Sequence, residues 1–572
     1  MKNREIAEIL SEIAKALALS NDNFFKIRAY ERAARAIKDL PEDIEKICKE
    51  GSLTDIPGVG EGIAKKIKEY LETGKMSKYE EVTKDIPHSL LALLDIRELG
   101  SKTLGVLHKE LGVLNLEDLK KVIEDGTFAK IEGLGKKKAE KILDNIREYE
   151  KRIGKQGRFL LGEVMLIVNE IVKKLKNIDS VTRVTPCGSY RRMKETLGDI
   201  DILVESKDSK KVMKKFTLFQ EVKKVLESGE TKTSVIIEGQ GIQMDLRVVP
   251  EESYGAALMY FTGSKDHNVH IRSLAQRRGL KINEYGVFRG SMRIAGKTEE
   301  EIYKLLHLQF IPPELREDRG EIELAMKGNL PQLVNYNDIK GNLHTHTKYS
   351  DGENTIRELV LKSLELGYSY LGISDHSKTA SYANGLSVTE LKKQSEEIDR
   401  LNEEFDEFTI LKGIECDILS DGSLDYAEDV LSSLDYVIGA IHSHFKKNVT
   451  LRMEKALENP YLTILAHPTG RLISKREGYE LDIERVMDKA KETEKILEIN
   501  AYYDRLDLDE HNTREAYKRG IKFCINTDAH NLRMFDWMDL GVGIARRAWL
   551  GASAVINTYK LKVLLGLIER NG

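Results

Sequence analysis

The chain has 572 residues, so at the usual ~100–200 residues per domain it divides into roughly three to five domains and is not a single compact one. Apolar residues make up 41% of the chain and charged residues 32%, and the lack of any long uninterrupted apolar run argues against a membrane-spanning protein. Lysine and arginine (90) nearly balance aspartate and glutamate (94), and the net charge of −4 excludes a broadly basic surface but not local anion binding.

Cysteine usage and the N-terminal residues indicate where the protein resides. The four cysteines lie far apart and form no CxxC pair, which is typical of a reducing compartment. The opening residues, MKNREIAEIL, carry charges where a signal peptide has its apolar core. We therefore expect a cytoplasmic protein.

The stretch up to about Lys155 is predicted to be helical, because its apolar residues recur at spacings of three and four. Three Gly-containing turns precede helices there, and two of them are followed by lysines. Glycine lets backbone N–H groups at a helix N-terminus approach a phosphate, and the helix dipole favours the anion. The turns predict binding to a phosphate backbone through Gly58, Gly60, Lys65, Lys68, Gly133, Gly135 and Lys136.

These turns resemble helix-hairpin-helix motifs, which hold nucleic-acid backbones. FKIRAYERAARAI (25–37) and PGVGEGIAKKIKEYLETGK (57–75) together resemble the amino-terminal lyase domain of DNA polymerase beta. The resemblance implies a Schiff-base lysine at Lys66, although a second family lysine corresponds to Gly62. Two roles stay open for Lys66, a lyase nucleophile and the favoured one, a solvated lysine beside a bound phosphate.

The middle stretch, 156–313, mixes helices with β-rich runs and carries three carboxylates. Asp199 and Asp201 alternate along the run DIDILV, so both face one side of a strand, and Asp245 comes from another β-like run. Adjacent anions on one face are costly unless a cation lies between them. The three carboxylates therefore predict a site for two Mg²⁺ or Mn²⁺ ions.

The string CGSYRRMKETLGDID adds donors for a triphosphate to this site, and it resembles the nucleotidyltransferase signature of a GS turn followed by a DxD strand. YFTGSKDHNVHIRSLAQRRGLKINEYGVF (260–288) resembles the thumb of family X DNA polymerases. These resemblances imply that Asp245 acts on the primer 3′-hydroxyl and that Arg272 reaches the template. They also imply nucleotide-binding roles for Gly188, Ser189, Arg192, Gly198, Tyr260, Phe261, Gly263 and Asn268.

From about residue 338, strands and helices are predicted to alternate, and apolar strands repeatedly end in His, Asp or Glu. Such endings place ligands at the C-terminal rim of a βα barrel. Seven of the 13 histidines occupy these positions. The candidate ligands are His344, His346, Asp351, His376, Glu415, His442 or His444 (His442 favoured), His467, Asp528 and His530.

Imidazole and carboxylate donors together suit Zn²⁺, Mn²⁺ or Fe²⁺ rather than Ca²⁺, and about nine ligands indicate more than two metals. The stretch resembles the PHP (polymerase and histidinol phosphatase) domain, which implies a distorted barrel with three divalent metals that cleaves phosphate esters. Because the full ligand set is present, we expect an active hydrolase.

Over nearly its full length the chain resembles a bacterial or archaeal family X DNA polymerase with a C-terminal PHP domain. The expected fold is an all-α helix-hairpin-helix region, an α+β nucleotidyltransferase palm and thumb, and a distorted (β/α)7-type barrel. The implied domains are a lyase-like helical domain (1–85), a fingers-like helical domain (86–155), a palm (156–250), a thumb (251–316), a linker (317–337) and a PHP domain (338–572).

The implied function is gap-filling DNA synthesis in repair, with a metal-dependent 3′–5′ exonuclease in the barrel and abasic-site processing as a further activity. Gapped DNA and deoxynucleoside triphosphates are the expected partners of a nucleoid-associated monomer. Two alternatives remain. One is a nucleotidyltransferase for a non-DNA substrate fused to a small-molecule phosphatase, and the other is a catalytically silent DNA-end tether.

Overall fold

The computed structural model describes the chain apart from residues 1, 21, 39, 41–43, 50, 57, 85, 87–89, 92, 97–98, 132–133, 136–137, 140, 144, 147–157, 240 and 569–572. It divides into two compact units, Met1–Gly157 and Arg158–Gly572. Among the helices in the described part of the chain, none combines the length and the apolarity that a membrane span requires.

The first unit is helical throughout its described residues, as predicted. Its α-helices and 3-10 turns are α1 (Lys2–Leu19), α2 (Phe24–Lys38), α3 (Ile44–Lys49), η1 (Leu53–Asp55), α4 (Glu61–Thr73), α5 (Ser77–Thr83), η2 (Leu93–Asp95), α7 (Ser101–Leu111), α8 (Leu116–Glu124) and η3 (Phe128–Lys130). Two apolar cores hold it together. Ile6 and Ile67 are fully buried in one core, and Leu104 and Leu119 in the other.

The second unit begins with a five-stranded sheet in the order β2-β4-β7-β6-β5. Its elements, with a separate β1-β3 pair, are β1 (Phe159–Leu160), α10 (Leu161–Lys176), β2 (Val181–Pro186), α11 (Gly188–Arg191), β3 (Thr196–Leu197), β4 (Asp199–Ser206), α12 (Ser209–Phe216), β5 (Val222–Ser228), β6 (Lys232–Ile237) and β7 (Gln243–Val249). Strands β4 and β7 are parallel, and the other neighbours are antiparallel. The predicted β-like runs that carry Asp199, Asp201 and Asp245 lie on β4 and β7 of this sheet.

A mixed segment follows the sheet. It consists of η4 (Glu251–Ser253), α13 (Tyr254–Thr262), α14 (Lys265–Arg277), β8 (Lys281–Asn283), β9 (Gly286–Arg289), β10 (Met292–Ala295), α15 (Glu299–Leu305), η5 (Pro313–Leu315), α16 (Glu321–Lys327) and η6 (Tyr336–Asp338). The span 317–337, predicted as a linker, contains α16 and buries Glu321, Ile322 and Val334.

The C-terminal part is a seven-stranded parallel sheet whose strands follow chain order. Its elements are β11 (Gly341–Asn342), α17 (Ile356–Glu365), β12 (Tyr370–Ile373), η7 (Ser381–Ala383), α18 (Val388–Glu404), β13 (Thr409–Asp417), α19 (Glu428–Leu431), β14 (Tyr436–Ala440), α20 (Val449–Leu457), β15 (Ile464–Leu465), α21 (Ile483–Glu492), β16 (Ile496–Asn500), α22 (Glu510–Lys518), β17 (Phe523–Asn526), η8 (Leu532–Trp537), α23 (Met538–Arg547), η9 (Ala552–Ala554), η10 (Ile556–Thr558) and α24 (Leu561–Ile568).

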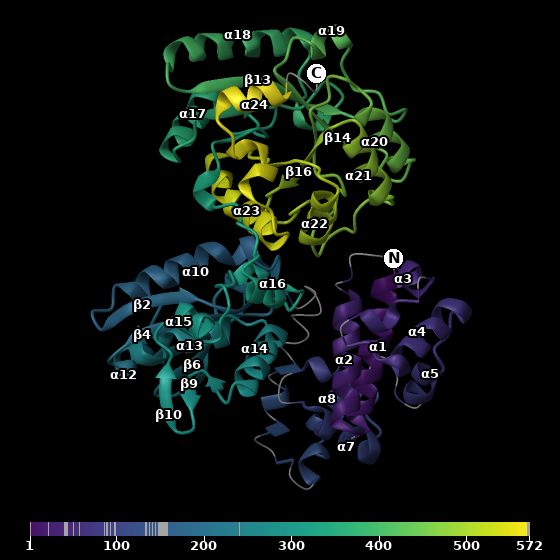
Figure 1. Ribbon diagram of the computed structural model, residues 1–572, viewed down its shortest axis with the longest axis vertical. Coiled ribbons are helices and arrows are strands. Elements are labelled where there is room, and N and C mark those ends of the chain that lie inside the picture. The colour runs from purple at the N-terminus through teal and green to yellow at the C-terminus, as the bar shows by residue number, and fades with distance from the viewer. Residues whose placement is uncertain are drawn as a thin grey trace. The chain divides into compact units, whose positions relative to one another are not determined.

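The sheet curves into a nearly closed barrel with helices around its strands (Figure 1). A parallel bridge between Thr345 and Ala529 joins the segments that follow the first and the last strand. The strand residues are almost all buried, because helices cover their outer face and side chains fill the interior. The predicted fold class is confirmed for all three regions.

Two candidate active sites

The first candidate site is built on two parallel strands of the five-stranded sheet. Asp199 and Asp201 lie on β4 and Asp245 on β7, and the ladder pairs Asp201 directly with Asp245. Ile200 and Ile202 between and beside them are buried on the opposite face. The three predicted carboxylates are therefore neighbours on one face of the sheet.

The GS turn packs against this face. Gly188 has a left-handed backbone (φ 61°), and a Cβ there would lie 2.8 Å from Asp201 Oδ2. The backbone N–H of Cys187 donates a hydrogen bond to the Asp201 carbonyl oxygen at 2.7 Å. Glycine is thus needed at position 188 both for its backbone angle and for the space that Asp201 occupies.

Charge is concentrated among the three carboxylates. Burial raises the pKa of Asp201 to about 7, and the neighbouring Asp199 and Asp245 contribute to that rise. Two residues that the sequence analysis did not single out contact Asp245: Gln243 Nε2 donates to it at 2.6 Å, and Lys232 Nζ lies 3.7 Å away. This cluster has the chemistry of a divalent-cation site, because a bound cation offsets the repulsion that disfavours ionisation.

The two arginines after the GS turn connect the sheet to the segment that follows it. Arg191 forms an ion pair with Glu299 at 2.7 Å, and Arg192 forms one with Glu317 at 3.1 Å. Arg192 Nη1 also donates to the Thr262 carbonyl oxygen at 2.5 Å. Ser189 lies on α11 beside these arginines, and Gly198 directly precedes Asp199.

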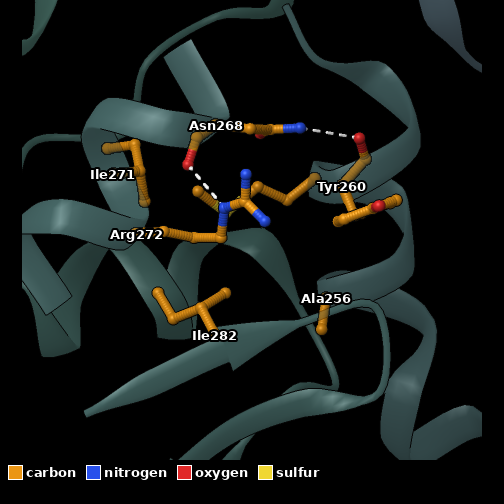
Figure 2. A pocket seen from close by; sticks show the side chains of 7 residues that line it. Ala256, Tyr260, Asn268, Ile271, Arg272 and Ile282 are labelled. Atoms are coloured by element: carbon orange, nitrogen blue, oxygen red, sulfur yellow. Dashed lines mark hydrogen bonds between the residues drawn. The ribbon is translucent and has the colours of Figure 1, made fainter. Parts of the chain in front are cut away.

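The predicted sugar and base residues gather at α13 and α14, where Tyr260 and Asn268 line a small pocket (Figure 2). Asn268 Nδ2 donates to the Tyr260 carbonyl oxygen at 2.7 Å, and Arg272 Nε donates to the Asn268 carbonyl oxygen at 3.3 Å. Phe261 stacks edge-on against Tyr260. A Cβ on Gly263 would lie 3.1 Å from the Arg192 guanidinium, which brings this segment next to the GS turn.

Several of the predicted DNA-contacting residues of the first unit lie at or after the turn that precedes α4. Gly58 has a left-handed backbone (φ 86°), and Gly60 caps the N-terminus of α4. Lys65 and Lys68 are exposed on α4, and Lys68 forms a loose ion pair with Glu72 at 3.8 Å. Gly135 also accepts backbone hydrogen bonds at a turn, whereas Gly133 and Lys136 lie outside the described residues.

Lys66 lies on the same helix as these lysines. Its Nζ donates a hydrogen bond to the Gly62 carbonyl oxygen at 2.8 Å. The position of the second family lysine is thus occupied by a residue that offers only its backbone.

The second candidate site lies where the barrel strands end. Eight of the predicted ligands form three overlapping groups whose donor atoms lie within 4.8 Å of one another: His346, Asp351, His376 and His530; His344, His346 and Asp528; His376, Glu415 and His442. The ninth, His467, approaches Glu415 with its Nε2 at 3.0 Å. His442 belongs to the cluster, whereas His444 is exposed and contacts Ser443.

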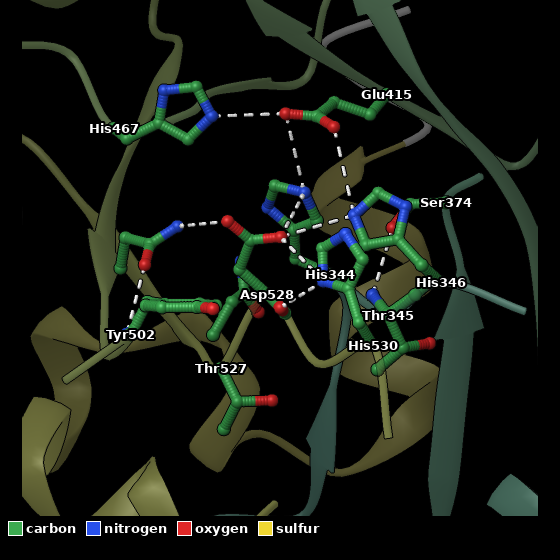
Figure 3. Close-up of polar contacts among 12 residues, drawn as sticks. His344, Thr345, His346, Ser374, Glu415, His467, Tyr502, Thr527, Asp528 and His530 are labelled. Carbon is green, nitrogen blue, oxygen red and sulfur yellow. Dashed lines mark hydrogen bonds and ion pairs between the residues drawn. The ribbon is translucent and has the colours of Figure 1, made fainter. Parts of the chain in front are cut away.

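Two carboxylates are shared among the imidazoles of this cluster. Glu415 Oε1 lies 3.4 Å from His442 Nε2. It also lies 3.0 Å from His467 Nε2, and Asp528 lies 3.1 Å from His346 Nε2 (Figure 3). Burial opposes ionisation of Asp351, but the neighbouring imidazoles lower its pKa to about 2. Such shared carboxylates are suited to bridging metals that lie a few ångströms apart.

Buried imidazole nitrogens without hydrogen-bond partners indicate whether metal ions fit this site. His344 Nε2, His346 Nδ1 and His467 Nδ1 are buried, and none of them has a hydrogen-bond partner in the described part of the chain. Buried polar atoms without partners are rare, and a metal is one of the groups that satisfies them. The donors fit a centre of transition-metal ions in number, chemistry and burial.

Two further carboxylates orient imidazoles of the cluster, and the sequence analysis did not single them out. Glu498 lies 2.7 Å from His344 Nδ1, and Asp417 lies 2.6 Å from His442 Nδ1. Both contacts leave the other ring nitrogen directed into the site, the arrangement that fixes a metal-ligating histidine. Both residues could have been predicted from the sequence, because Asp417 and Glu498 also lie on barrel strands that end at this rim.

Comparison with protein families assigns five segments of the chain. The matches are a helix-hairpin-helix domain (1–76), a SAM-like helix-hairpin-helix tandem (90–148), the DNA polymerase beta palm (161–250), the DNA polymerase beta thumb (257–317) and the PHP domain (342–503).

Curated proteins similar to the chain cover it in whole or in part. The DNA polymerase/3′-5′ exonuclease PolX of Bacillus subtilis is 40% identical over 100% of both chains. DNA polymerase lambda of Rattus norvegicus is 26% identical over 55% of this chain and 56% of its own length. A probable phosphatase of Thermoanaerobacter sp. is 29% identical over 40% of this chain and 94% of its own length.

Proposed function

Because the chain belongs to the family X DNA polymerases that carry a C-terminal PHP domain, we propose that it fills short gaps in DNA during repair and trims 3′ ends with its barrel. It is a DNA polymerase with a 3′–5′ exonuclease, it binds DNA and nucleotides, and it depends on divalent metals. We further propose that the protein acts as a monomer at the nucleoid.

The proposed polymerase site consists of Asp199, Asp201 and Asp245, which would hold two Mg²⁺ or Mn²⁺ ions. When bound, divalent metals at either centre of the protein would polarise phosphate oxygens and activate the attacking hydroxyl or water. Asp245 is placed to act on the primer 3′-hydroxyl, and the hydrogen bond from Gln243 holds its carboxylate in position.

The proposed nucleotide subsite lies beside these carboxylates. Ser189 and Arg192 would contact the nucleotide phosphates, and this role is supported by their position next to Gly188, which packs against Asp201. A guanidinium can donate two parallel hydrogen bonds to phosphate oxygens and offset their charge. Tyr260 and Asn268 would then frame the sugar and base.

The proposed exonuclease site consists of the nine clustered side chains at the barrel rim, which would hold three divalent metals, Zn²⁺, Mn²⁺ or Fe²⁺. Glu498 and Asp417 keep two of the imidazoles in their ligating orientation. Glu415 lies on a barrel strand and the others lie in segments that follow strand ends, so the barrel supports the whole set, which suits precise placement of a phosphodiester.

The observation that carries the polymerase assignment is the pairing of Asp201 with Asp245 on parallel strands, directly below the GS turn. Three carboxylates on one sheet face repel one another, and a bound cation would offset that repulsion more fully than the nearby Lys232. Together with a glycine turn and an arginine, they form a site for a metal-bound triphosphate.

The test uses a gapped DNA with an end-labelled primer, incubated with Mg²⁺ or Mn²⁺, with and without deoxynucleoside triphosphates. We expect extension to the end of the gap when nucleotides are present and shortening of the primer when they are absent. Phosphate release from small monoesters is measured in parallel. Monoester hydrolysis without any change in primer length would favour a small-molecule phosphatase fused to a transferase for another substrate.

A further inference from the structure

The loop that follows α11 carries Arg192, and each of its four residues, 192–195, contacts the barrel. The Arg192 carbonyl oxygen accepts a hydrogen bond from Arg547 Nη1 of α23 at 2.6 Å. Met193 packs at Gly543 of the same helix, where a Cβ would come within 2.6 Å of Met193 Cε. The other two contacts are ion pairs, Lys194 with Glu510 at 3.4 Å and Glu195 with Arg471 at 2.7 Å.

A single carboxylate bridges the two arginines at the centre of this contact. Glu317 lies 3.1 Å from Arg192 Nε and 3.0 Å from Arg547 Nη1. The Arg547 side chain is 1% exposed, so water cannot replace these partners. Although burial opposes its ionisation, the surrounding cations lower the pKa of Glu317 to about 2.

Cationic side chains from several segments share two carboxylates in this network. Arg192, Lys194, Arg319 and Arg547 each contact Glu317 or Glu510. A nucleotide triphosphate beside Arg192 would supply further negative charge to the same network. The barrel thus contributes to the electrostatic surroundings of the phosphates as well as to the position of the loop.

We infer that Arg547 is a positioning residue for nucleotide addition. Through Arg547, the barrel would hold the loop 192–195 of the polymerase's nucleotide subsite in position. The inference rests on the proposed role of Arg192 in phosphate binding. Arg547 contacts the Arg192 backbone directly and its guanidinium through Glu317, while the Thr262 carbonyl oxygen accepts a hydrogen bond from the same guanidinium. Displacement of a substrate-positioning group by 1 Å can cost roughly a hundredfold in rate, so kcat/KM for the nucleotide should fall when this support is lost.

The neighbouring residue on α23 provides a matched control. Arg546 is also partly buried and forms an ion pair across to Glu314 at 2.7 Å, and its Nη1 donates to the Val334 carbonyl oxygen at 2.7 Å. No contact of Arg546 recorded in the described residues involves the loop 192–195. Loss of Arg546 therefore perturbs the same helix and a similar ion pair without touching Arg192.

The experiment compares Arg547→Met, Arg547→Lys and Arg546→Met in the full-length protein. Nucleotide KM and kcat are measured on gapped DNA, and exonuclease rates on single-stranded DNA. We expect Arg547→Met to raise the nucleotide KM about tenfold or more and to leave the exonuclease rate unchanged. Arg547→Lys should show a smaller rise in KM. Arg546→Met should have the KM of wild type. An equal KM for Arg547→Met and Arg546→Met would overturn the inference.

A second variant covers the case in which Arg547→Met does not fold. Glu317→Gln keeps Arg547 but removes the negative charge that bridges it to Arg192, and this variant should also raise the nucleotide KM. Unchanged KM in Glu317→Gln would overturn the inference as well. A wild-type protein that never extends a primer would instead contradict the proposed polymerase function. Failure of the proposed function and failure of the inference about Arg547 are therefore distinguishable.

Discussion

Asp201 lies directly opposite Asp245 on parallel neighbouring strands, and Gly188 leaves just enough room for the Asp201 carboxylate. The pairing brings together residues that are far apart in the chain. It also leaves Asp201 half-buried beneath the Gly188 turn, whereas Asp199 is exposed at the strand end. This constraint makes Asp201 the best position at which to test the polymerase site.

Asp201→Ala should abolish nucleotide addition and leave DNA binding nearly intact. Loss of a group that stabilises transition-state charge lowers kcat by about 10²–10³-fold, and loss of a shared metal ligand should reach at least the upper end of that range. The measurement is single-nucleotide insertion on a gapped, labelled primer. DNA affinity is measured by fluorescence anisotropy on the same substrate.

Two controls accompany this variant. Without metals its unfolding temperature should equal or exceed that of wild type, because removing a buried carboxylate relieves repulsion from Asp199 and Asp245. Its exonuclease should persist, because the barrel centre uses other residues. Full extension activity in Asp201→Ala would disprove the assignment of the site.

His344→Ala should remove the exonuclease and leave primer extension close to wild type. His344 is fully buried, and its free Nε2 lies between Glu415 and Asp528 in the cluster. We expect a loss of exonuclease rate of about 10³-fold, together with a lower metal content by elemental analysis. Asp528→Ala should lose exonuclease activity and metal content in the same way as His344→Ala.

The outcome that would contradict this prediction is an equal loss of extension and degradation. That result would mean that the metal centre maintains the fold of the barrel, since His344 makes no contact with α23 among its recorded contacts. Circular dichroism of the variant separates such a structural defect from a local one.

Local patterns were sufficient to predict much of both sites. Alternation along a strand placed Asp199 and Asp201 on one face, and strand-end residues located the barrel cluster. In the choice between His442 and His444, proximity to the apolar run favoured His442. The structure places His442 in the cluster, while a left-handed backbone at His444 (φ 55°) accompanies its exposure.

Contacts between distant segments could not be predicted in this way. Glu317 and Arg547 are 230 residues apart, and neither lies in a recognisable motif. The sequence predicts a linker at 317–337, yet within it Glu321 is fully buried and paired with His267 at 2.7 Å. Composition alone does not distinguish a solvated charge from a buried, paired one.

Gly58→Ala should destabilise the first helical unit and weaken DNA binding. Position 58 has a φ of 86°, and a Cβ there would lie 3.0 Å from Arg32 Cβ. A left-handed backbone costs an L-residue roughly 1–2 kcal/mol, before any steric clash. The unfolding temperature and the affinity for gapped DNA at several salt concentrations are the measurements.

Gly60→Ala is the matched control for Gly58→Ala. Gly60 has a φ of −84°, and a Cβ there would meet no atom within 4 Å. The variant should keep wild-type stability, because no strain or clash arises, so a loss of affinity in it would report the predicted phosphate contact of Gly60 itself. Equal losses of stability in the two variants would contradict the predicted strain at Gly58.

Borohydride should trap no covalent adduct between the protein and abasic-site DNA through Lys66. The amine is engaged with the Gly62 carbonyl oxygen at 2.8 Å, and position 62 carries no second lysine. Lys66→Ala should lower DNA affinity slightly, because it removes one cation from the phosphate-facing helix. A trapped adduct that disappears in Lys66→Ala would instead establish a lyase.

Glu498→Gln should weaken metal binding at the barrel. Glu498 is fully buried, its Oε1 lies 2.7 Å from His344 Nδ1, and its Oε2 accepts a hydrogen bond from the His467 backbone N–H at 2.9 Å. The amide keeps the shape of the side chain but removes the charge that favours the ligating tautomer of His344. Loss of such a partner lowers metal affinity by about 10–100-fold.

The measurement for Glu498→Gln is metal retained after dialysis against graded chelator, which does not depend on activity. Asp435→Asn is the control, because Asp435 precedes β14 at the opposite end of the barrel and accepts from the Lys412 backbone N–H at 2.7 Å. Asp435→Asn should retain metal like wild type. If Glu498→Gln retains it equally well, Glu498 has only a packing role, and His344 is oriented by its other neighbours.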